Sequence, residues 1–406
     1  MPHALIARQP IVDGDVRVVG YELLYRGRQS GPLAGFDGET ATATVAINTL
    51  LDLGLTAVAG EHPVFVNLTR AFFERELYLA LPSSRVVLEV LETVEPDQGM
   101  VALMRRARAL GYRVALDDYV HSERMAPLVA EADIIKVEAL DLSEREMFEV
   151  ARALRRPGLT LLAEKIESRE RFEIAREAGF ELFQGWFYAR PDLLRRRTLQ
   201  ADRATLLQVL AAIEDPDVDF DRIGELVEHN LALSHKLLRY VNSALFTLPQ
   251  EVDSIRHACS MLGIERVRTC VLLLLLSEVD DKPRELMFNA LSRARLCQML
   301  APQERGEVEQ SYFTVGLFSL LDAYLDRSLE ELLEEIPLSE DVKRAILEHA
   351  GEPGAALEAA IACERADWSA LEAGAVEPEQ LQRMYVSALE WTRRVERALI
   401  RAESQR

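Results

Sequence analysis

The chain has 406 residues, of which 49% are hydrophobic and 28% charged, and its formal net charge is −20. This length suits two domains with hydrophobic cores of their own, in an ordinary globular protein. Such an acidic chain is not expected to bind DNA or an anionic membrane through a general surface. Its four cysteines lack C-x-x-C spacing, and no basic stretch followed by an apolar segment opens the sequence. We therefore expect reduced thiols in a cytoplasmic protein without an export signal.

The first half of the chain alternates short apolar runs with amphipathic segments. Predicted strands cover residues 4–12, 18–24, 64–67, 86–91, 112–117, 133–137, 159–164 and 182–187. Predicted helices cover residues 41–53, 97–110, 143–155 and 168–178, and Gly111 and Gly179 follow two of them as C-terminal stops. Strands that recur with helices between them indicate βα units and a mainly parallel sheet. So many units in the first half of the chain favour a TIM-like α/β barrel over an open sheet.

Polar side chains stand near the C-terminal ends of most of these strands. They are Asn67, Glu89, Asp117, Lys136, Glu164 and Gln184, and Glu22 lies inside an early strand. In a TIM-type barrel these strand ends converge on the face where active sites are built. Each residue alone has an ordinary explanation, since Asp117 and Asp118 could cap a helix and Lys136 could extend its ammonium group into water. Their repetition on successive strands favours a shared site.

The residue types at these strand ends indicate a particular chemistry. Several carboxylates and an amide, without convergent cysteine or histidine, are the oxygen ligands that Mg²⁺ or Mn²⁺ prefers. So many like charges need cations to compensate them. Lys136 lies in an apolar strand, where an ammonium group is unusual unless it faces carboxylates, metal or phosphate. Together these features predict hydrolysis of a phosphodiester by a metal-activated water.

The first half of the chain resembles the EAL domain, a cyclic di-GMP phosphodiesterase fold, over about residues 1–192. The motifs are Glu22-Leu-Leu-Tyr-Arg26, Val66-Asn-Leu68, Glu89-Val-Leu-Glu92, Asp117-Asp118, Ile135-Lys-Val137, Ala163-Glu-Lys-Ile-Glu167 and Gln184-Gly185. The resemblance implies metal ligands at Glu22, Asn67, Glu89, Asp117 and Glu164, with Asp118 beside them. It further implies a base-like Lys136, supporting residues Gln184, Glu167 and Glu92, and a substrate phosphate on Arg26. An antiparallel first strand and cyclic di-GMP as the ligand also come from the resemblance.

Three places depart from the EAL pattern. Where the family continues after the paired Asp as D-F-G-x-G-x-S-S, this chain has Tyr119-Val-His-Ser-Glu-Arg124, without glycine. A loop that needs glycine conformations cannot keep its shape with these residues. Lys165 stands for the Gly of the A-E-G-V-E segment, where it either adds an ammonium near the mouth or points to water, and Glu138 replaces an Asp. We therefore expect this chain to retain the metal ligands of the EAL pattern but to lack the family's loop after the paired Asp.

The second half shows almost no period-2 pattern, so we predict an all-α domain. Helical periodicity covers residues 203–213, 220–231, 234–242, 254–262, 265–279, 284–300, 312–325, 328–335, 339–350, 353–366 and 378–402. The predicted domains are 1–192 and 201–406, with a linker at 193–200. The helical half resembles the HDOD domain in Leu237-Leu-Arg-Tyr-Val-Asn-Ser-Ala244, Ser254-Ile-Arg-His-Ala258 and Leu262-Gly263. Catalytic HD relatives need a His-Asp pair that this chain lacks, so we expect a non-catalytic interaction module.

An EAL domain followed by an HDOD domain is similar to the YuxH-like regulators of bacterial signalling. Together with the lost loop, the resemblance predicts a cytoplasmic regulator whose EAL half is degenerate, with weak or no activity. This half is expected to bind cyclic di-GMP and divalent metal, while the HDOD half contacts signalling proteins. Two alternatives stay open. The first is an active metal-dependent phosphodiesterase that releases the linear dinucleotide, and the second is an assembly platform that binds no nucleotide. The partner and the oligomeric state, including a homodimer, also stay open.

Overall fold

The computed structural model describes residues 4–27, 54–120, 122–190, 207, 210–214, 231–243, 245–246, 252–277, 279, 282–302, 306–374 and 376–403. The chain divides into two compact units. Unit 1 comprises Met1–Tyr188 and Ala362–Arg383, and unit 2 comprises Ala189–Ile361 and Met384–Arg406. The predicted linker at 193–200 lies outside the described residues, so a domain boundary there stays a prediction.

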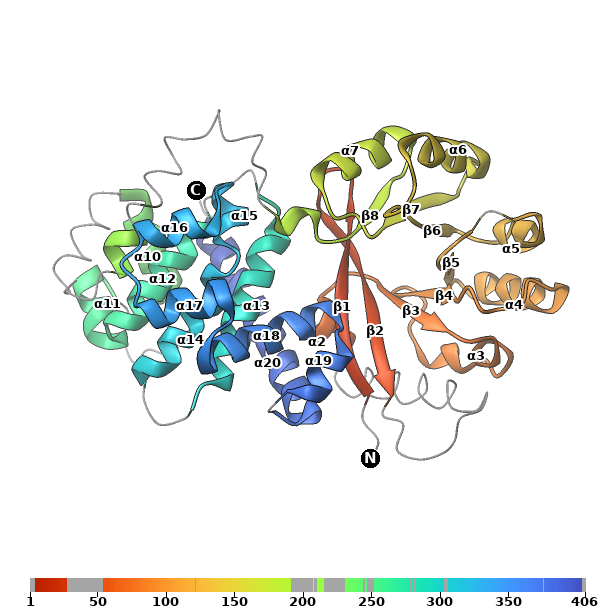
Figure 1. The fold of residues 1–406 in the computed structure, drawn as a ribbon. Coiled ribbons are helices and arrows are strands. Elements are labelled where there is room, and N and C mark those ends of the chain that lie inside the picture. Colours follow the sequence, from red (N-terminus) through yellow and green to blue (C-terminus); the bar gives the residue numbers. More distant parts are fainter. Residues whose placement is uncertain are drawn as a thin grey trace. The chain divides into compact units, whose positions relative to one another are not determined.

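Unit 1 is built on a closed eight-stranded barrel with the strands in sequence order (Figure 1). They are β1 (Ala4–Asp13), β2 (Val18–Gly27), β3 (Val64–Leu68), β4 (Val86–Val90), β5 (Arg113–Leu116), β6 (Ile134–Glu138), β7 (Thr160–Glu164) and β8 (Leu182–Gln184). β1 pairs antiparallel with both β2 and β8. All other neighbouring strands are parallel. The predicted barrel and its antiparallel first strand are confirmed.

An apolar layer of side chains fills the barrel interior. Its members are each at most 2% exposed and come from six strands: Ile11, Phe65, Val87, Ala115, Ile134 and Leu162. Because side chains alternate along a strand, the residue two places further on points into the barrel again. That step leads from five of these positions to Asn67, Glu89, Asp117, Lys136 and Glu164. The pleat therefore sets a polar layer above the apolar one, at the C-terminal ends of the strands.

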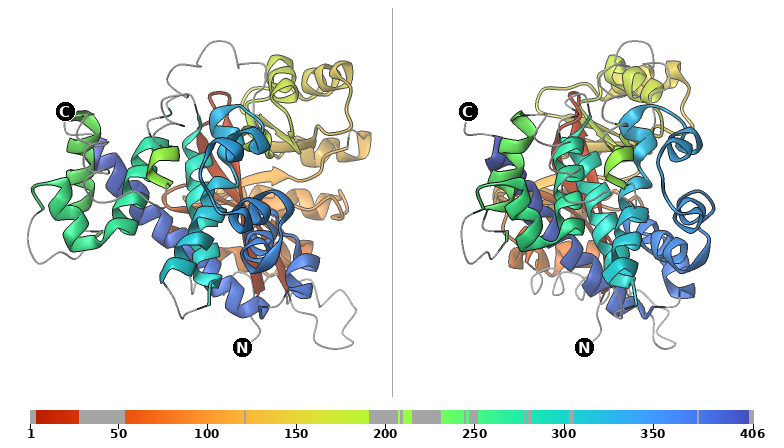
Figure 2. Two further views of the ribbon diagram at one scale, coloured as in Figure 1. Left: turned by 60° about the vertical axis from the view of Figure 1, so that its left-hand side comes forward. Right: turned by 90° about the vertical axis from the view of Figure 1, so that its left-hand side faces the viewer.

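Helices lie outside the strands, as α3 to α7 do in Figures 1 and 2. Unit 1 contains α2 (Leu55–Ala59), α3 (Arg70–Glu74), α4 (Gln98–Ala109), α5 (Ala126–Val129), α6 (Glu144–Leu154) and α7 (Arg169–Ala178). Short 3₁₀ helices are η1 (Leu77–Ala80), η2 (Glu123–Met125) and η3 (Phe187–Ala189). α4, α6 and α7 match predicted helices, whereas α2, α3 and α5 were not predicted because four or five residues show no helical period. The predicted helix at 41–53 lies outside the described residues.

Polar caps explain where the three predicted helices begin. Asp97, Ser143 and Ser168 each accept a hydrogen bond from an amide in the first turn. Such caps satisfy amides that have no partner within the helix. α7 ends at Gly179, which is in the left-handed conformation with φ of 106°. Gly111, with φ of 91°, follows the C-cap residue of α4.

The described residues of unit 2 contain helices and no strand. These helices include α10 (Leu231–Val241), α11 (Ile255–Leu262), α12 (Ile264–Ser277), α13 (Arg284–Leu300), α14 (Gly306–Phe318), α15 (Leu321–Leu325), α16 (Leu329–Glu335), α17 (Glu340–Glu348), most of α18 (Gly351–Arg365) and most of α20 (Pro378–Glu403). The predicted helix at 312–325 is divided between α14 and α15. At the break, the Ser319 hydroxyl donates a hydrogen bond to the carbonyl of Gly316 and accepts one from the Arg293 guanidinium, which interrupts the helix. Residues 220–230 and most of 203–213 lie outside the described part.

The C-terminal segment Ala362–Arg383 belongs to unit 1. It contains α19 (Trp368–Ala373) and the start of α20 (Pro378–Glu403), a helix of 26 residues that Figure 2 shows as one continuous element. The amide of Ile6 in β1 donates a 3.0 Å hydrogen bond to Oε1 of Gln382 in α20. A main-chain donor of the first strand thus finds its acceptor on the last helix. No pattern in the sequence indicates this contact.

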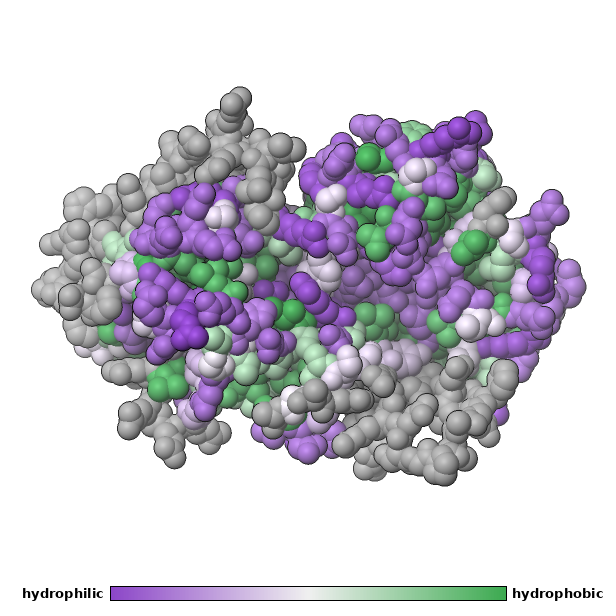
Figure 3. Space-filling model, viewed as in Figure 1, coloured by the Kyte–Doolittle hydropathy of each residue, from purple (hydrophilic) through white to green (hydrophobic). Residues whose placement is uncertain are grey.

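The surface of the described residues is mixed. Hydrophilic residues predominate on the face in Figure 3, and hydrophobic residues form small separate groups there. Val120 is the most exposed of the large hydrophobic side chains described, at 77%. The four cysteine side chains are buried and form no disulfide. Within the described ranges, no helix is long and apolar enough to cross a membrane.

Candidate functional site

Lys136 lies at the centre of the polar layer. Its side chain is only 1% exposed, so its ammonium group does not reach water. Carboxylate oxygens surround its Nζ: Glu22 Oε2 at 3.1 Å, Glu89 Oε1 at 3.0 Å, Asp117 Oδ1 at 2.7 Å and Glu164 Oε1 at 3.0 Å. We call these four residues the carboxylate cluster. With all four ionised, one positive and four negative charges leave a formal charge of −3.

Two side-chain amides hold Glu22 in this cluster. Asn67 Nδ2 donates to Glu22 Oε1 at 2.9 Å, and Gln184 Nε2 donates to Glu22 Oε2 at 2.6 Å. Gln184 Nε2 also donates to Gln9 Oε1 at 2.8 Å, and the hydroxyl of Tyr25 donates to the carbonyl of Asn67. Sequence reasoning missed Gln9 and Tyr25. A glutamine inside the apolar run 4–12 was the available signal for Gln9.

Burial and charge set the protonation of the carboxylate cluster. Burial raises the pKa of Glu164 to about 8 and the pKa of Glu89 well above its ordinary value. Lys136 lowers both pKa values, whereas the negative charges of Glu22 and Asp117 raise them. Burial also raises the pKa of Asp117. Burial also acts to raise the pKa of Glu22. The charge of Lys136 and the hydrogen bonds that the Glu22 carboxylate accepts outweigh burial, so the pKa of Glu22 is lowered. Burial disfavours the charged Lys136, yet the four carboxylates raise its pKa well above the ordinary value.

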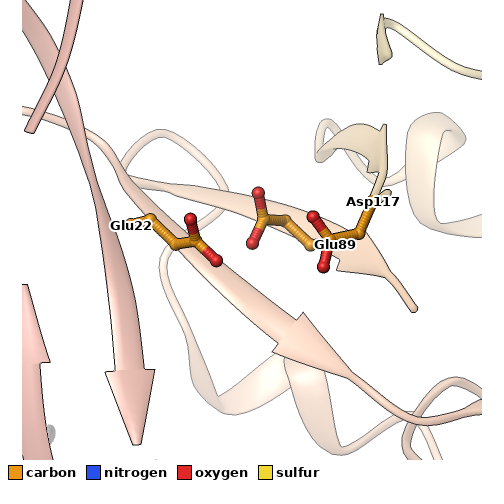
Figure 4. Close-up of side chains that lie close together, drawn as sticks. All are labelled: Glu22, Glu89 and Asp117. Atoms are coloured by element: carbon orange, nitrogen blue, oxygen red, sulfur yellow. The ribbon is translucent and has the colours of Figure 1, made fainter. Parts of the chain in front are cut away.

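The carboxylate cluster fits a divalent cation. Oxygens of Glu22, Glu89 and Asp117 lie within 4.8 Å of one another, and Figure 4 shows the three carboxylates converging from different strands. Among the described residues, Glu89 Oε2, Glu164 Oε2 and Asn67 Oδ1 are buried without a hydrogen-bond partner. Buried acceptors of this kind are costly unless something satisfies them. Oxygen-only donors with surplus negative charge suit Mg²⁺, Mn²⁺ or Ca²⁺.

A second acidic group lies at the mouth of the barrel. Glu92, Asp117 and Asp118 each offer an oxygen within 4.8 Å of the others, and Glu92 and Asp118 are exposed. Asp118 is left-handed, with φ of 42°, which Asp tolerates better than most residues. Asp118, which follows Asp117 in the chain, directs a carboxylate oxygen toward those of Asp117 and Glu92. Exposed acidic groups are common without a metal, so this group alone assigns no ion.

The loop after Asp118 begins against β6. The amide of Tyr119 donates to the carbonyl of Lys136 at 2.9 Å, and the Tyr119 side chain is buried. Val120 then points outward, and His121 lies outside the described residues. Of the remaining predicted residues, Glu167 lies exposed between β7 and α7, and the Arg26 side chain lies outside the description.

Lys165 follows Glu164 at the end of β7. Its Nζ lies 2.5 Å from Glu138 Oε2, and the two side chains are 52% and 35% exposed. The hydrogen bond with Glu138 raises the pKa of Lys165. Its φ of 53° is in the left-handed region, which costs a non-glycine residue about 1 kcal/mol. Of the two predicted alternatives, the structure favours an ammonium held at the mouth by a carboxylate.

A cleft of 1410 Å³ lies at the other end of the barrel strands. It is lined by α6, α7 and residues such as Thr160 and Leu161, which begin β7, whereas Glu164 ends that strand. Both arginines, including Arg152 and Arg155, and glutamates line it, and none of the predicted site residues does. The carboxylate cluster is therefore the candidate site.

Comparisons with known proteins identify the families of the two halves of the chain. The model of the EAL domain matches residues 44–191, and the model of the HDOD domain matches residues 199–350. The chain is 32% identical over 403 residues to the cyclic di-GMP phosphodiesterase CdgJ of Vibrio cholerae, covering 97% of this chain and 93% of that protein. It is 29% identical over 397 residues to YuxH of Bacillus subtilis, covering 95% of this chain and 97% of that protein.

Two solved structures are similar to part of the chain. Klebsiella pneumoniae BlrP1, in complex with calcium and cyclic di-GMP, is 24% identical with a TM-score of 0.38, covering 46% of this chain and 55% of that one. The Bacillus subtilis YkuI protein has an EAL domain and was solved with cyclic di-GMP and calcium. It is 23% identical with a TM-score of 0.38, covering 55% of this chain and 71% of that one.

Proposed function

Because this chain belongs to the family of two-domain proteins that join an EAL domain to an HDOD domain, we propose that it is a cyclic di-GMP signalling regulator. Its barrel binds the dinucleotide and a divalent cation, with weak or absent hydrolysis. Its helical domain contacts signalling proteins. The carboxylate cluster around buried Lys136, retained beside a loop without glycine, is the observation that carries this proposal.

The binding half of the proposal rests on the donor set. The residues that would hold the cation are Glu22, Asn67, Glu89, Asp117 and Glu164. When bound, a divalent cation supplies Lewis-acid polarisation of a phosphoryl oxygen. The Nζ of Lys136 lies within 3.1 Å of the four carboxylates that would hold the cation. Its ammonium would therefore lie near a phosphodiester bound to that cation and would stabilise the negative charge that develops when the phosphodiester is attacked.

Weak or absent turnover rests on the loop after Asp118. Tyr119 is buried and bonded to β6, and the exposed Val120 stands where the EAL pattern has glycine. A β-branched residue cannot adopt glycine's left-handed conformations without strain. A loop with different geometry would leave the reacting groups less well ordered, and small displacements of reacting groups slow catalysis strongly.

A non-catalytic helical domain is supported by the described histidines of unit 2. His257 Nδ1 lies 3.1 Å from Asp253, and His349 Nδ1 lies 3.3 Å from Glu358. Within the described part of this unit, no three His, Cys, Asp or Glu side chains converge as metal ligands would. Because the sequence also lacks a His-Asp pair, we assign the unit to protein contacts.

An active phosphodiesterase is the second candidate. Two facts favour it: all five proposed ligands are present, and CdgJ, which is 32% identical to this chain, is a cyclic di-GMP phosphodiesterase. In that case Mg²⁺ or Mn²⁺ should support conversion of cyclic di-GMP to the linear dinucleotide. Glu22→Ala and Lys136→Ala should then abolish the activity.

Calorimetric titration with cyclic di-GMP in Ca²⁺, followed by a hydrolysis assay in Mn²⁺, separates the candidates. We expect binding, with turnover no greater than that of Glu22→Ala. The matched variants are Glu89→Gln in the carboxylate cluster and Glu285→Gln, a buried glutamate of unit 2. Only Glu89→Gln should lose binding. Turnover clearly above the Glu22→Ala background favours the active enzyme, and absence of binding refutes both candidates in favour of a nucleotide-free platform.

A further inference from the structure

Two proposed metal ligands are each followed by a left-handed residue that is not glycine. Asp118, with φ of 42°, follows Asp117, and Lys165, with φ of 53°, follows Glu164. Such outliers persist where the surrounding structure holds them, and they gather at functional sites. Asp118 and Glu164 both act electrostatically on Lys165. The ammonium of Lys165 therefore lies in the field of the site although the cluster itself is buried.

Lys165 and Glu138 also mark two departures from the EAL pattern, and the structure joins them in one ion pair. Lys165 Nζ lies 2.5 Å from Glu138 Oε2. Glu138 ends β6, the strand that carries Lys136, and it is the register partner of Glu164 on β7. The pair therefore bridges the rim of the barrel beside the carboxylate cluster.

We propose that Lys165 binds a phosphate of the dinucleotide, and that Glu138 holds its ammonium at the mouth until the phosphate arrives. This inference rests on the proposed function, because the anion is the phosphate of cyclic di-GMP. Lys165 exchanges one anionic partner for another, and no covalent bond changes.

Electrostatics gives the reason for a cation at this point. The buried carboxylate cluster and the exposed Glu92 and Asp118 repel an incoming phosphate. Lys165 offers an opposite charge on a flexible stem, with half of its side chain exposed. Ion pairs this exposed contribute little net stability, so the exchange of Glu138 for phosphate has a small cost.

Three substitutions test the inference by calorimetric titration with cyclic di-GMP in Ca²⁺. Lys165→Met keeps much of the side-chain volume without the charge and should weaken binding about tenfold, the loss typical of a charge-assisted hydrogen bond. Lys165→Arg should restore most of the affinity. Glu138→Gln removes the competing carboxylate and should tighten binding about threefold. Affinity for cyclic di-GMP should also depend less on salt in Lys165→Met. Ca²⁺ alone should bind this variant at least as tightly as it binds the wild type, because removing an ammonium group near the site does not repel a cation.

Lys165→Gly guards against a structural explanation, because glycine relieves the left-handed strain at this position. This variant should unfold at the same or a higher temperature than the wild type and still bind cyclic di-GMP more weakly. If the wild type binds cyclic di-GMP, and Lys165→Met and Lys165→Gly both bind it as tightly as the wild type does, the role of Lys165 is refuted while the proposed function stands. If the wild type binds no cyclic di-GMP, the proposed function and this inference are both overturned.

Discussion

Replacing Lys136 with methionine tests the charge balance of the site directly. Met retains most of the stem but removes the ammonium group that lies 2.7–3.1 Å from four carboxylates. Removing one partner of a buried ion pair leaves an uncompensated charge and costs about 3–5 kcal/mol. Because Lys136 is 1% exposed, water screens little of this loss. We expect the free energy of unfolding to fall by about 3–5 kcal/mol near pH 8.

The loss should depend on pH in a defined direction. Burial already raises the pKa of Glu164 to about 8 and the pKa of Glu89 well above normal, and removing the ammonium raises both further. A carboxyl whose pKa is higher in the folded state gives stability that is present at low pH and lost as pH rises through that pKa. The variant should therefore lie closer to the wild type near pH 5.5 than near pH 8.

Scanning calorimetry at both pH values, with and without Mn²⁺, measures these effects. A cation bound to the folded state raises its stability, and it should do so more in Lys136→Met because the competing ammonium is gone. Lys282→Met is the control, since Lys282 Nζ lies 2.6 Å from buried Asp326 in unit 2. That variant should be destabilised without a larger Mn²⁺ response. If Lys136→Met loses less than about 1 kcal/mol near pH 8 and responds to Mn²⁺ like the wild type, the described charge balance is wrong.

Three further changes probe the scaffold and the helical unit. In Gly185→Ala the added Cβ would lie 2.0 Å from the carbonyl oxygen of Ile166, and the φ of 147° at Gly185 disfavours any side chain. We expect denaturation to show a free energy of unfolding lower by about 2–3 kcal/mol, together with weaker cyclic di-GMP binding. Gln382→Ala leaves the buried Ile6 amide without its acceptor and should lower the unfolding free energy by about 1–2 kcal/mol. Burial raises the pKa of Glu214 from 4.5 to about 7, so the stability from its proton is lost as pH rises through 7. Glu214→Gln should therefore gain stability over the wild type across that range, as thermal melts at several pH values would measure.

Each of these changes has a matched control or a contrary result. Gly158→Ala is the control for Gly185→Ala, because its added Cβ has no atom within 4 Å and its φ of 79° leaves only backbone strain. If both variants lose the same free energy of unfolding, the steric argument for Gly185 is contradicted. Gln380→Ala lies on the exposed side of α20 and should be neutral. Equal stability of Gln382→Ala and Gln380→Ala would remove the case for the Ile6 contact. A gain in Glu214→Gln that is the same at pH 4.5 and pH 8 would show that ionisation is not its cause.

The polar layer was predictable because each of its residues follows an apolar, inward-facing residue of the same strand by two places. Glu89 follows Val87 by two places and Lys136 follows Ile134 by two places, so local alternation alone puts each polar group above an apolar one. The pairing of Lys165 with Glu138 was not predictable, because it depends on φ at Lys165 and on the register of β6 with β7. The break between α14 and α15 was missed because side-chain hydrogen bonds at Ser319, and not periodicity, end the helix.

The sequence by itself determined the barrel, the helical half and the residues that meet at the strand ends. Alternation of side chains along a strand is a local property, and a closed barrel brings the C-terminal ends of its strands to one face. Only the tertiary structure decided how those residues share charge. Four carboxylates from β2, β4, β7 and the end of β5 surround Lys136 because the closed barrel brings together strands far apart in the chain. The hydrogen bond between Ile6 and Gln382 likewise joins positions 376 residues apart, which no local pattern encodes.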